Sequence, residues 1–160
     1  MENNHWIVDD WLIFKPEFNE ELTNYYGIIN KYKKIMFSNY DDFLIAIETN
    51  NEYNNNYIKN KFDQEIDLSN NINLTHLTFG YTFNQKIDLS NNINLTHLTF
   101  GYIFNQEIDL SNNINLTHLT FGWGFNKEIN IPLNVKSLNM YKCNNQYIID
   151  NLHNNIEELK

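Results

Sequence analysis

The sequence contains no arginine and is poor in basic residues of any kind. Its 160 residues include 11 basic residues, all of them lysine, against 20 acidic ones, and the formal net charge at pH 7 is -9. A protein that grips a phosphate backbone or an anionic membrane needs a basic face, usually with arginine for bidentate contacts. Nucleic acids and membranes are therefore poor candidates as partners, and we expect neither.

Cysteine and long apolar runs are also scarce. Cys143 is the single cysteine, which excludes an intramolecular disulfide and fits a reducing compartment. No apolar run approaches the roughly 20 residues of a membrane span. Residues 1–6 are acidic and polar, where a signal peptide has positive charge followed by an apolar stretch. We therefore expect an intracellular protein, in the cytoplasm (of the host cell if the protein is viral).

Asparagine, by contrast, makes up about a fifth of the chain. Asparagine-rich chains are often low in complexity and prone to aggregate, but here the asparagines recur in register with other residues. The residues that recur every 21 positions include His76, His97 and His118; Gly80, Gly101 and Gly122; and Asn84, Asn105 and Asn126. A fixed period of this length is typical of a solenoid. We predict one short strand, one turn and one return segment per coil, with the strands forming a parallel sheet.

Each coil has a repeated pattern of apolar side chains. Strand alternation places Leu77 and Phe79 inward and Thr78 outward. The remaining inward positions of the coil are predicted at Phe83, Ile87, Leu89 and Ile93. Because each position is apolar in all three copies, the stacked coils should share one continuous core.

The same register predicts the limits of the solenoid. Strands are expected to begin near residues 32, 53, 74, 95, 116 and 135, with a partial one near 156. The solenoid should thus cover residues 32–160, with clear repeats over 60–140 and an incomplete last coil. Residues 1–31 do not fit the period and are predicted to form a cap over the first coil. Its main element is an amphipathic helix over about 19–30, with Asn19 as N-cap.

The repeat also carries a family resemblance. The pattern Leu-x-Phe-Gly-x-x-Phe-Asn-x-x-Ile, which begins at Leu77, occurs three times, and Ile131–Val135 precedes the last clear strand. It resembles the FNIP repeat family of social amoebae and of giant amoebal viruses such as mimivirus. The resemblance implies a leucine-rich-repeat-like solenoid, a protein-interaction role and no catalytic residues. Relatives often carry an F-box ahead of the repeats, but residues 6–30 lack its leucine-proline start and its length.

Three columns of outward side chains form the candidate binding face. They are His76, His97 and His118; Thr78, Thr99 and Thr120; and Tyr81, Tyr102 and Trp123. Tyrosine and tryptophan are enriched at interface hot spots, which favours binding over the alternative of a plain solvated sheet. The histidines could instead form a metal site or a pH-sensitive surface. However, ligands in a straight row about 5 Å apart do not converge on one ion at about 2.1 Å, so we predict no metal and no cofactor.

Two further columns lie at turns and have structural interpretations. Asn84, Asn105 and Asn126 are predicted to form a ladder that bonds to backbone groups of neighbouring turns. Asp67, Asp88 and Asp109 are predicted to cap turns by accepting hydrogen bonds from nearby amides. Calcium binding is the alternative for the aspartates, but each turn offers one acid where calcium needs several oxygen ligands.

The sequence shows no nucleophile-and-base pair, phosphate loop or carboxylate dyad, so we predict no enzymatic activity. The favoured function is a rigid scaffold that binds a protein partner through the candidate binding face. One alternative is a substrate adaptor of a ubiquitin ligase, with residues 1–31 as a degenerate or missing F-box. The other is a self-associating module that forms a homodimer through the incomplete coil at residues 156–160.

Overall fold

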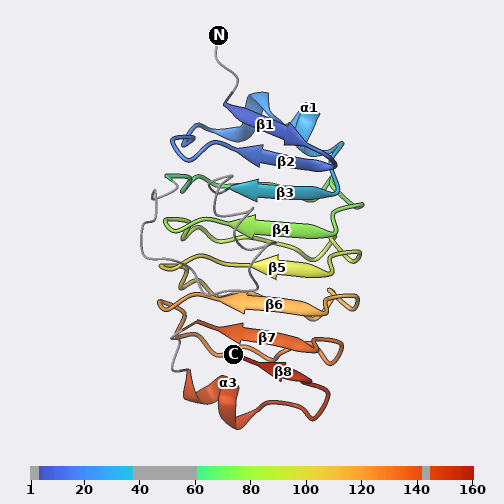
Figure 1. The fold of residues 1–160 in the computed structure, drawn as a ribbon, viewed down its shortest axis with the longest axis vertical. Helices are drawn as coiled ribbons and strands as arrows, with labels where there is room; N and C mark the ends of the chain where they lie inside the picture. Colours follow the sequence, from blue (N-terminus) through green and yellow to red (C-terminus); the bar gives the residue numbers. More distant parts are fainter. Residues whose placement is uncertain (1–3, 38–60, 142–144) are drawn as a thin grey trace.

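A computed structural model describes residues 4–37, 61–141 and 145–160. The described residues form an eight-stranded sheet whose strands follow one another in sequence order. The strands are β1 (His5–Val8), β2 (Trp11–Phe14), β3 (Lys34–Phe37), β4 (His76–Phe79), β5 (His97–Thr99), β6 (His118–Phe121), β7 (Ser137–Met140) and β8 (Glu158–Leu159). They are stacked like the rungs of a ladder (Figure 1). All neighbouring pairs from β2 to β8 are parallel, whereas β1 pairs with β2 in antiparallel fashion.

The strand register reproduces the sequence period. Leu77 pairs with Leu98, and Leu98 pairs with Leu119, so identical residues lie side by side in β4, β5 and β6. Leu119 then pairs with Leu138, which is two residues nearer in sequence, before the longer spacing returns between β7 and β8. The predicted solenoid, with one short strand in each coil of about 21 residues, is confirmed.

The sheet extends into the segment that the sequence assigns to a cap. Trp11 in β2 pairs in parallel with Lys34 in β3, and β1 then covers the outer edge of β2. Within the predicted helix, only a 3-10 turn η1 (Leu22–Asn24) and a short helix α1 (Tyr26–Ile29) form. Asn19 does not cap η1, which begins after Glu21 without a side-chain cap bond. Residue 32 is therefore not a boundary of the sheet, because residues 11–33 already form one coil.

The strand expected near residue 53 does not lie between its predicted neighbours. Residues 53–58 are outside the described part of the chain, and β3 pairs directly with β4, with Lys34 opposite His76. The two strands are thus two periods apart in sequence but adjacent in the sheet.

Phenylalanine fills the core in two stacked rows. The rings of Phe79 and Phe83 lie 3.8 Å apart within one coil, and Phe79 lies 5.7 Å from Phe100 in the next. The pair Phe100 and Phe104 repeats the arrangement, again at 3.8 Å. These rings are almost entirely buried. Each coil therefore packs its aromatic pair against that of its neighbour, and the core is continuous along the sheet.

One predicted core position is wrong, and an asparagine takes its place. Ile93 is 48 % exposed, whereas the adjacent Asn92 is completely buried. The Asn92 side chain donates to the carbonyl oxygens of Leu68 (3.1 Å) and Asn71 (2.9 Å) in the preceding coil. Asn113 does the same one coil further on. The Leu68 and Asn71 carbonyls already accept the backbone amides of Asn71 and Leu74, so Asn92 adds a second hydrogen bond to each. We call Asn71, Asn92 and Asn113 the buried ladder.

The other end of the described solenoid carries a short helix. Helix α3 (Gln146–Asp150) begins at Asn145, whose side chain accepts a hydrogen bond from the Ile148 amide. Asn145 also donates to the carbonyl of Lys127 at 2.8 Å, which ties the helix to the preceding coil. No helix within the described ranges is long and apolar enough to cross a membrane.

Close stacking at the glycine column makes Gly101 intolerant of any side chain. A Cβ atom there would lie 1.9 Å from the carbonyl oxygen of Gly80, while one at Gly27 would meet nothing within 4 Å. We expect Gly101→Ala to lower the free energy of unfolding by about 3 kcal/mol or more. The matched control Gly27→Ala should raise it by about 0.5–1 kcal/mol, because alanine is the better helix former. Chemical denaturation measures both, and equal effects would contradict the close approach.

The buried ladder should contribute more stability than an exposed asparagine with a similar interaction. Asn92→Ala removes two buried hydrogen bonds and should cost about 2–4 kcal/mol of unfolding free energy. Asn94 is exposed and donates once, to the Ile72 carbonyl at 2.9 Å, so Asn94→Ala should cost less than about 1 kcal/mol. Urea denaturation of the two variants tests this ranking, and the reverse order would refute it.

Candidate functional site

The candidate binding face begins on the outer side of β4, β5 and β6. Leu77 and its equivalents are buried, so the residues on either side, His76 and Thr78, point outward. Because identical residues pair across the strands, three histidines form one row and three threonines form the next. The structure therefore brings the predicted histidine and threonine columns together on one surface.

The histidines form a stack of nearly parallel rings. His76 and His97 have ring centroids 4.2 Å apart and an interplanar angle of 8°, and His97 and His118 lie 4.1 Å apart at the same angle. Trp11 from β2 lies edge-on to His76 at 5.5 Å. Lys34 lies opposite His76 in the register and forms an ion pair with Asp10 at 2.9 Å. Trp11 was not predicted to lie on this face, because it precedes its partner Lys34 by 23 residues and so does not fit the 21-residue period.

A threonine hydroxyl lies beside Nδ1 of each histidine in the row. Thr96 Oγ1 lies 2.9 Å from His97 Nδ1 and donates its single proton to the carbonyl oxygen of Thr75 at 3.0 Å. A hydroxyl that donates to the carbonyl accepts from the ring, so we expect the proton on Nδ1. The pairs Thr75–His76 and Thr117–His118 have the same geometry. With this tautomer, each neutral imidazole keeps Nε2 as a hydrogen-bond acceptor.

Two histidines of the row, His76 and His97, have lowered pKa values, which keep their rings uncharged at neutral pH. Burial, followed by the positive charge that His76 and His118 would carry, lowers the pKa of His97 to about 4. Burial and the charge of Lys34 also lower the pKa of His76, against an opposing effect of Asp10. A stack of charged imidazoles would repel internally, so the environment favours the uncharged ring. At neutral pH this part of the face offers acceptors and not cations.

The aromatic column lies beyond the carboxyl ends of the same strands, after the glycine column. Tyr81 and Tyr102 stack with centroids 4.8 Å apart and planes 4° apart, and Tyr102 lies 5.5 Å from Trp123 at 15°. The two tyrosines are half-buried, whereas Trp123 is 56 % exposed. A large exposed aromatic ring on a rigid support is typical of an interface anchor.

The asparagines at the turn after the inner phenylalanine bond from coil to coil. Asn84 Oδ1 accepts from the Asn105 amide at 2.8 Å, and Asn105 Oδ1 accepts from the Asn126 amide at 2.9 Å. The row continues toward the N-terminal end, because Asp63 Oδ1 accepts from the Asn84 amide and Asn19 Oδ1 accepts from the Asp63 amide. We call these five residues the turn ladder. These hydrogen bonds join neighbouring turns, so they fix the spacing of the coils, as predicted for the asparagines.

The aspartates at the following turn each cap their own backbone. The carboxylates of Asp67, Asp88 and Asp109 accept at 2.9 Å from the amides of Ser69, Ser90 and Ser111. Hydrogen bonds from these serines lower the pKa of all three carboxyls. In the described part of the chain, no group of three or more histidine, cysteine or acidic side chains is arranged to hold a metal ion.

We expect His97 to remain neutral, with the proton on Nδ1, down to about pH 4. Its pKa is about 4 in the folded protein and near 6.5 when unfolded, so between these values the unfolded state binds more protons. Stability should therefore fall as the pH drops through this window, by on the order of 1 kcal/mol for a half-exposed ring.

Nitrogen-15 NMR of the imidazoles reports both the tautomer and the pKa of His97. Thr96→Val should remove the preference for Nδ1–H, because the ring loses its acceptor. Denaturation at pH 7 and pH 5 should show a smaller difference for His97→Gln than for the wild type. A His97 that titrates near 6.5, or one protonated on Nε2, would contradict the arrangement.

Comparison with known proteins yields one structural neighbour. No family model matches the chain, and no curated protein matches it, so FNIP membership stays a prediction. A crystal structure described as that of CroV588, a novel circular LRR protein, is 30 % identical with a TM-score of 0.43. The match covers 86 % of this chain and 28 % of that protein, so this chain spans little more than a quarter of its length.

Proposed function

We propose that this protein is a non-enzymatic scaffold that binds a protein partner through the candidate binding face. The observation that carries the proposal is the exposed end of the aromatic column, where Trp123 is 56 % exposed on a rigid stack. Solenoids present extended surfaces of this kind to their ligands. Beside the aromatic column, the threonines and the neutral histidines supply polar groups.

The geometry favours a partner surface with hydrogen-bond donors and an apolar centre. His76 and His97 are held as acceptors by their threonines, and Trp123 supplies apolar area that a partner can bury. Interface energy is concentrated in such aromatic anchors, with the polar groups around them deciding fit. The histidines lie on strands packed into the core and Trp123 lies in the turn directly after β6, so binding needs no rearrangement of the sheet.

The other two functions remain proposals of lower rank. In the adaptor hypothesis residues 1–31 recruit a ubiquitin ligase, but residues 11–33 form a coil of the solenoid and β2 pairs with β3. Self-association through β8 is favoured by Leu159, which is 52 % exposed on a strand at the edge of the sheet. A strict monomer at high protein concentration, measured by light scattering, would contradict self-association.

The binding face can be tested by affinity purification from the native host with quantitative mass spectrometry. We expect the combined variant Tyr81→Ala, Tyr102→Ala and Trp123→Ala to reduce recovery of the specific partner at least about 10-fold, as expected from loss of an aromatic hot spot. Ile72→Ala is the matched control, because Ile72 is 57 % exposed and lies outside the face. Equal recovery with all three proteins would contradict the proposal. A ligase scaffold that the aromatic variant still recovers would instead favour the adaptor function.

A further inference from the structure

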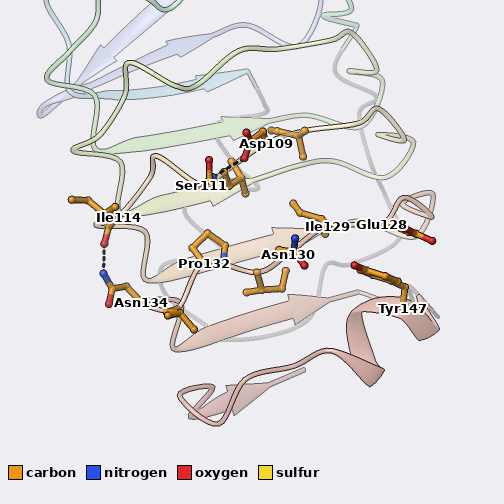
Figure 2. Close-up of a pocket in the computed structure, with 13 residues that line it drawn as sticks. Asp109, Ser111, Ile114, Glu128, Ile129, Asn130, Pro132, Asn134 and Tyr147 are labelled. Atoms are coloured by element: carbon orange, nitrogen blue, oxygen red, sulfur yellow. Dashed lines mark hydrogen bonds between the residues drawn. The ribbon is translucent and has the colours of Figure 1, made fainter.

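A groove lies away from the sheet, between the return segments of the coils that lead to β6 and β7 (Figure 2). It is half open and has a volume of about 840 Å³. Asp109–Ser111 and Ile114 line it from one coil, Glu128–Asn134 from the next, and Tyr147 from α3. None of these residues belongs to the candidate binding face.

The groove arises from a two-residue deletion. The pairing of Leu119 with Leu138 aligns the two coils, and Asn115 and Asn134 bond to equivalent carbonyls of Ile93 and Ile114. In this alignment Ser111 and Asn112 have no counterparts, because residues 109–113 correspond to the three residues 130–132. The stack of equivalent turns therefore ends at Ser111. The next coil lacks the residues that would continue the stack, and the groove lies in their place.

The deletion also interrupts the buried ladder. In the buried ladder, the Leu89 carbonyl accepts from the Asn113 side chain at 3.0 Å as well as from the Asn92 amide. The equivalent Leu110 carbonyl accepts from the Asn113 amide, but the next ladder position is Pro132, which has no amide group to donate. The ladder therefore ends at Leu110, which is itself only 1 % exposed, so this break lies beneath the groove surface.

The rest of the lining combines aliphatic and acidic groups. Ile114 is 59 % exposed and Leu133 is 67 % exposed, whereas Ile131 is buried beneath them. Asp109 and Glu128 supply two carboxylates, and no lysine lines the groove. Every charged group here is thus an anion beside aliphatic surface, in a protein with a net charge of -9.

We propose that this groove binds a segment of a partner polypeptide in which a lysine or arginine lies between aliphatic residues. The aliphatic stem of the basic side chain packs on Ile114 and Leu133, and its cationic head reaches the Glu128 carboxylate. Charge complementarity selects this occupant over an acidic or a purely apolar segment. The site is independent of the candidate binding face, so either can exist without the other.

The probe is a short, fluorophore-labelled peptide in which leucine and lysine alternate, with both ends blocked. We expect saturable binding to the whole protein by fluorescence anisotropy. The peptide with glutamate in place of lysine should not bind, and the one with serine in place of leucine should bind at least about 10-fold more weakly, from the lost apolar burial. No binding to the wild type, or equal binding of the serine peptide, would overturn the proposal.

Matched variants locate the site. Glu128→Gln should weaken binding about 2–5-fold, the range of an exposed ion pair, and Leu133→Ser about 10-fold, from the lost aliphatic contact. The controls are Glu65→Gln, at the equivalent position three coils away, and Ile72→Ser, whose side chain is 57 % exposed. If either control weakens binding as much as its counterpart, the groove is not the site. Trp123→Ala should leave peptide binding unchanged, which separates this result from the test of the binding face.

Discussion

Hydrogen bonds between neighbouring coils are the constraint on which the rest of this structure depends. A solenoid coil has little regular structure of its own, so its backbone groups must find partners in the coils beside it. The strands supply part of these bonds, and asparagine side chains supply much of the remainder. Asn92 reaches two carbonyls of the preceding coil, and Asn105 accepts an amide from the following one. The high asparagine content therefore has a structural use at fixed positions.

The same constraint shapes the surface. When equivalent residues lie side by side at the strand spacing, any outward residue becomes a row, and its interactions with its own copies become important. The imidazoles of His76 and His118, stacked 4.1–4.2 Å from His97, disfavour protonation of His97, and a threonine hydroxyl lies beside each ring. Aromatic rings in a row cover each other's faces, so the exposed area gathers at Trp123. A repeated sequence thus produces a surface whose chemistry differs from that of one isolated copy.

Departures from the repeat matter as much as the repeat. The shortened coil before β7 interrupts the buried ladder at Pro132 and opens the groove beside Ser111 (Figure 2). In the next coil, His153 occupies the position equivalent to Pro132, and its Nε2 lies 3.0 Å from the Pro132 carbonyl oxygen. One irregular coil therefore creates a site without disturbing the sheet on the opposite side, because β6, β7 and β8 remain paired.

The sequence by itself determined the period, the parallel sheet and the alternation that turns His76 and Thr78 outward, because these follow from spacing and from the two-residue repeat of a strand. It did not determine the ends of the regular region, where β2 is offset by 23 residues and β3 pairs across two periods with β4. Nor did it distinguish Asn92 from Ile93 as the buried residue, since hydrophobicity favours the isoleucine. Only the folded chain decided that point, because two carbonyl groups of the preceding coil converge there and the Asn92 side chain can donate to both, which an isoleucine cannot.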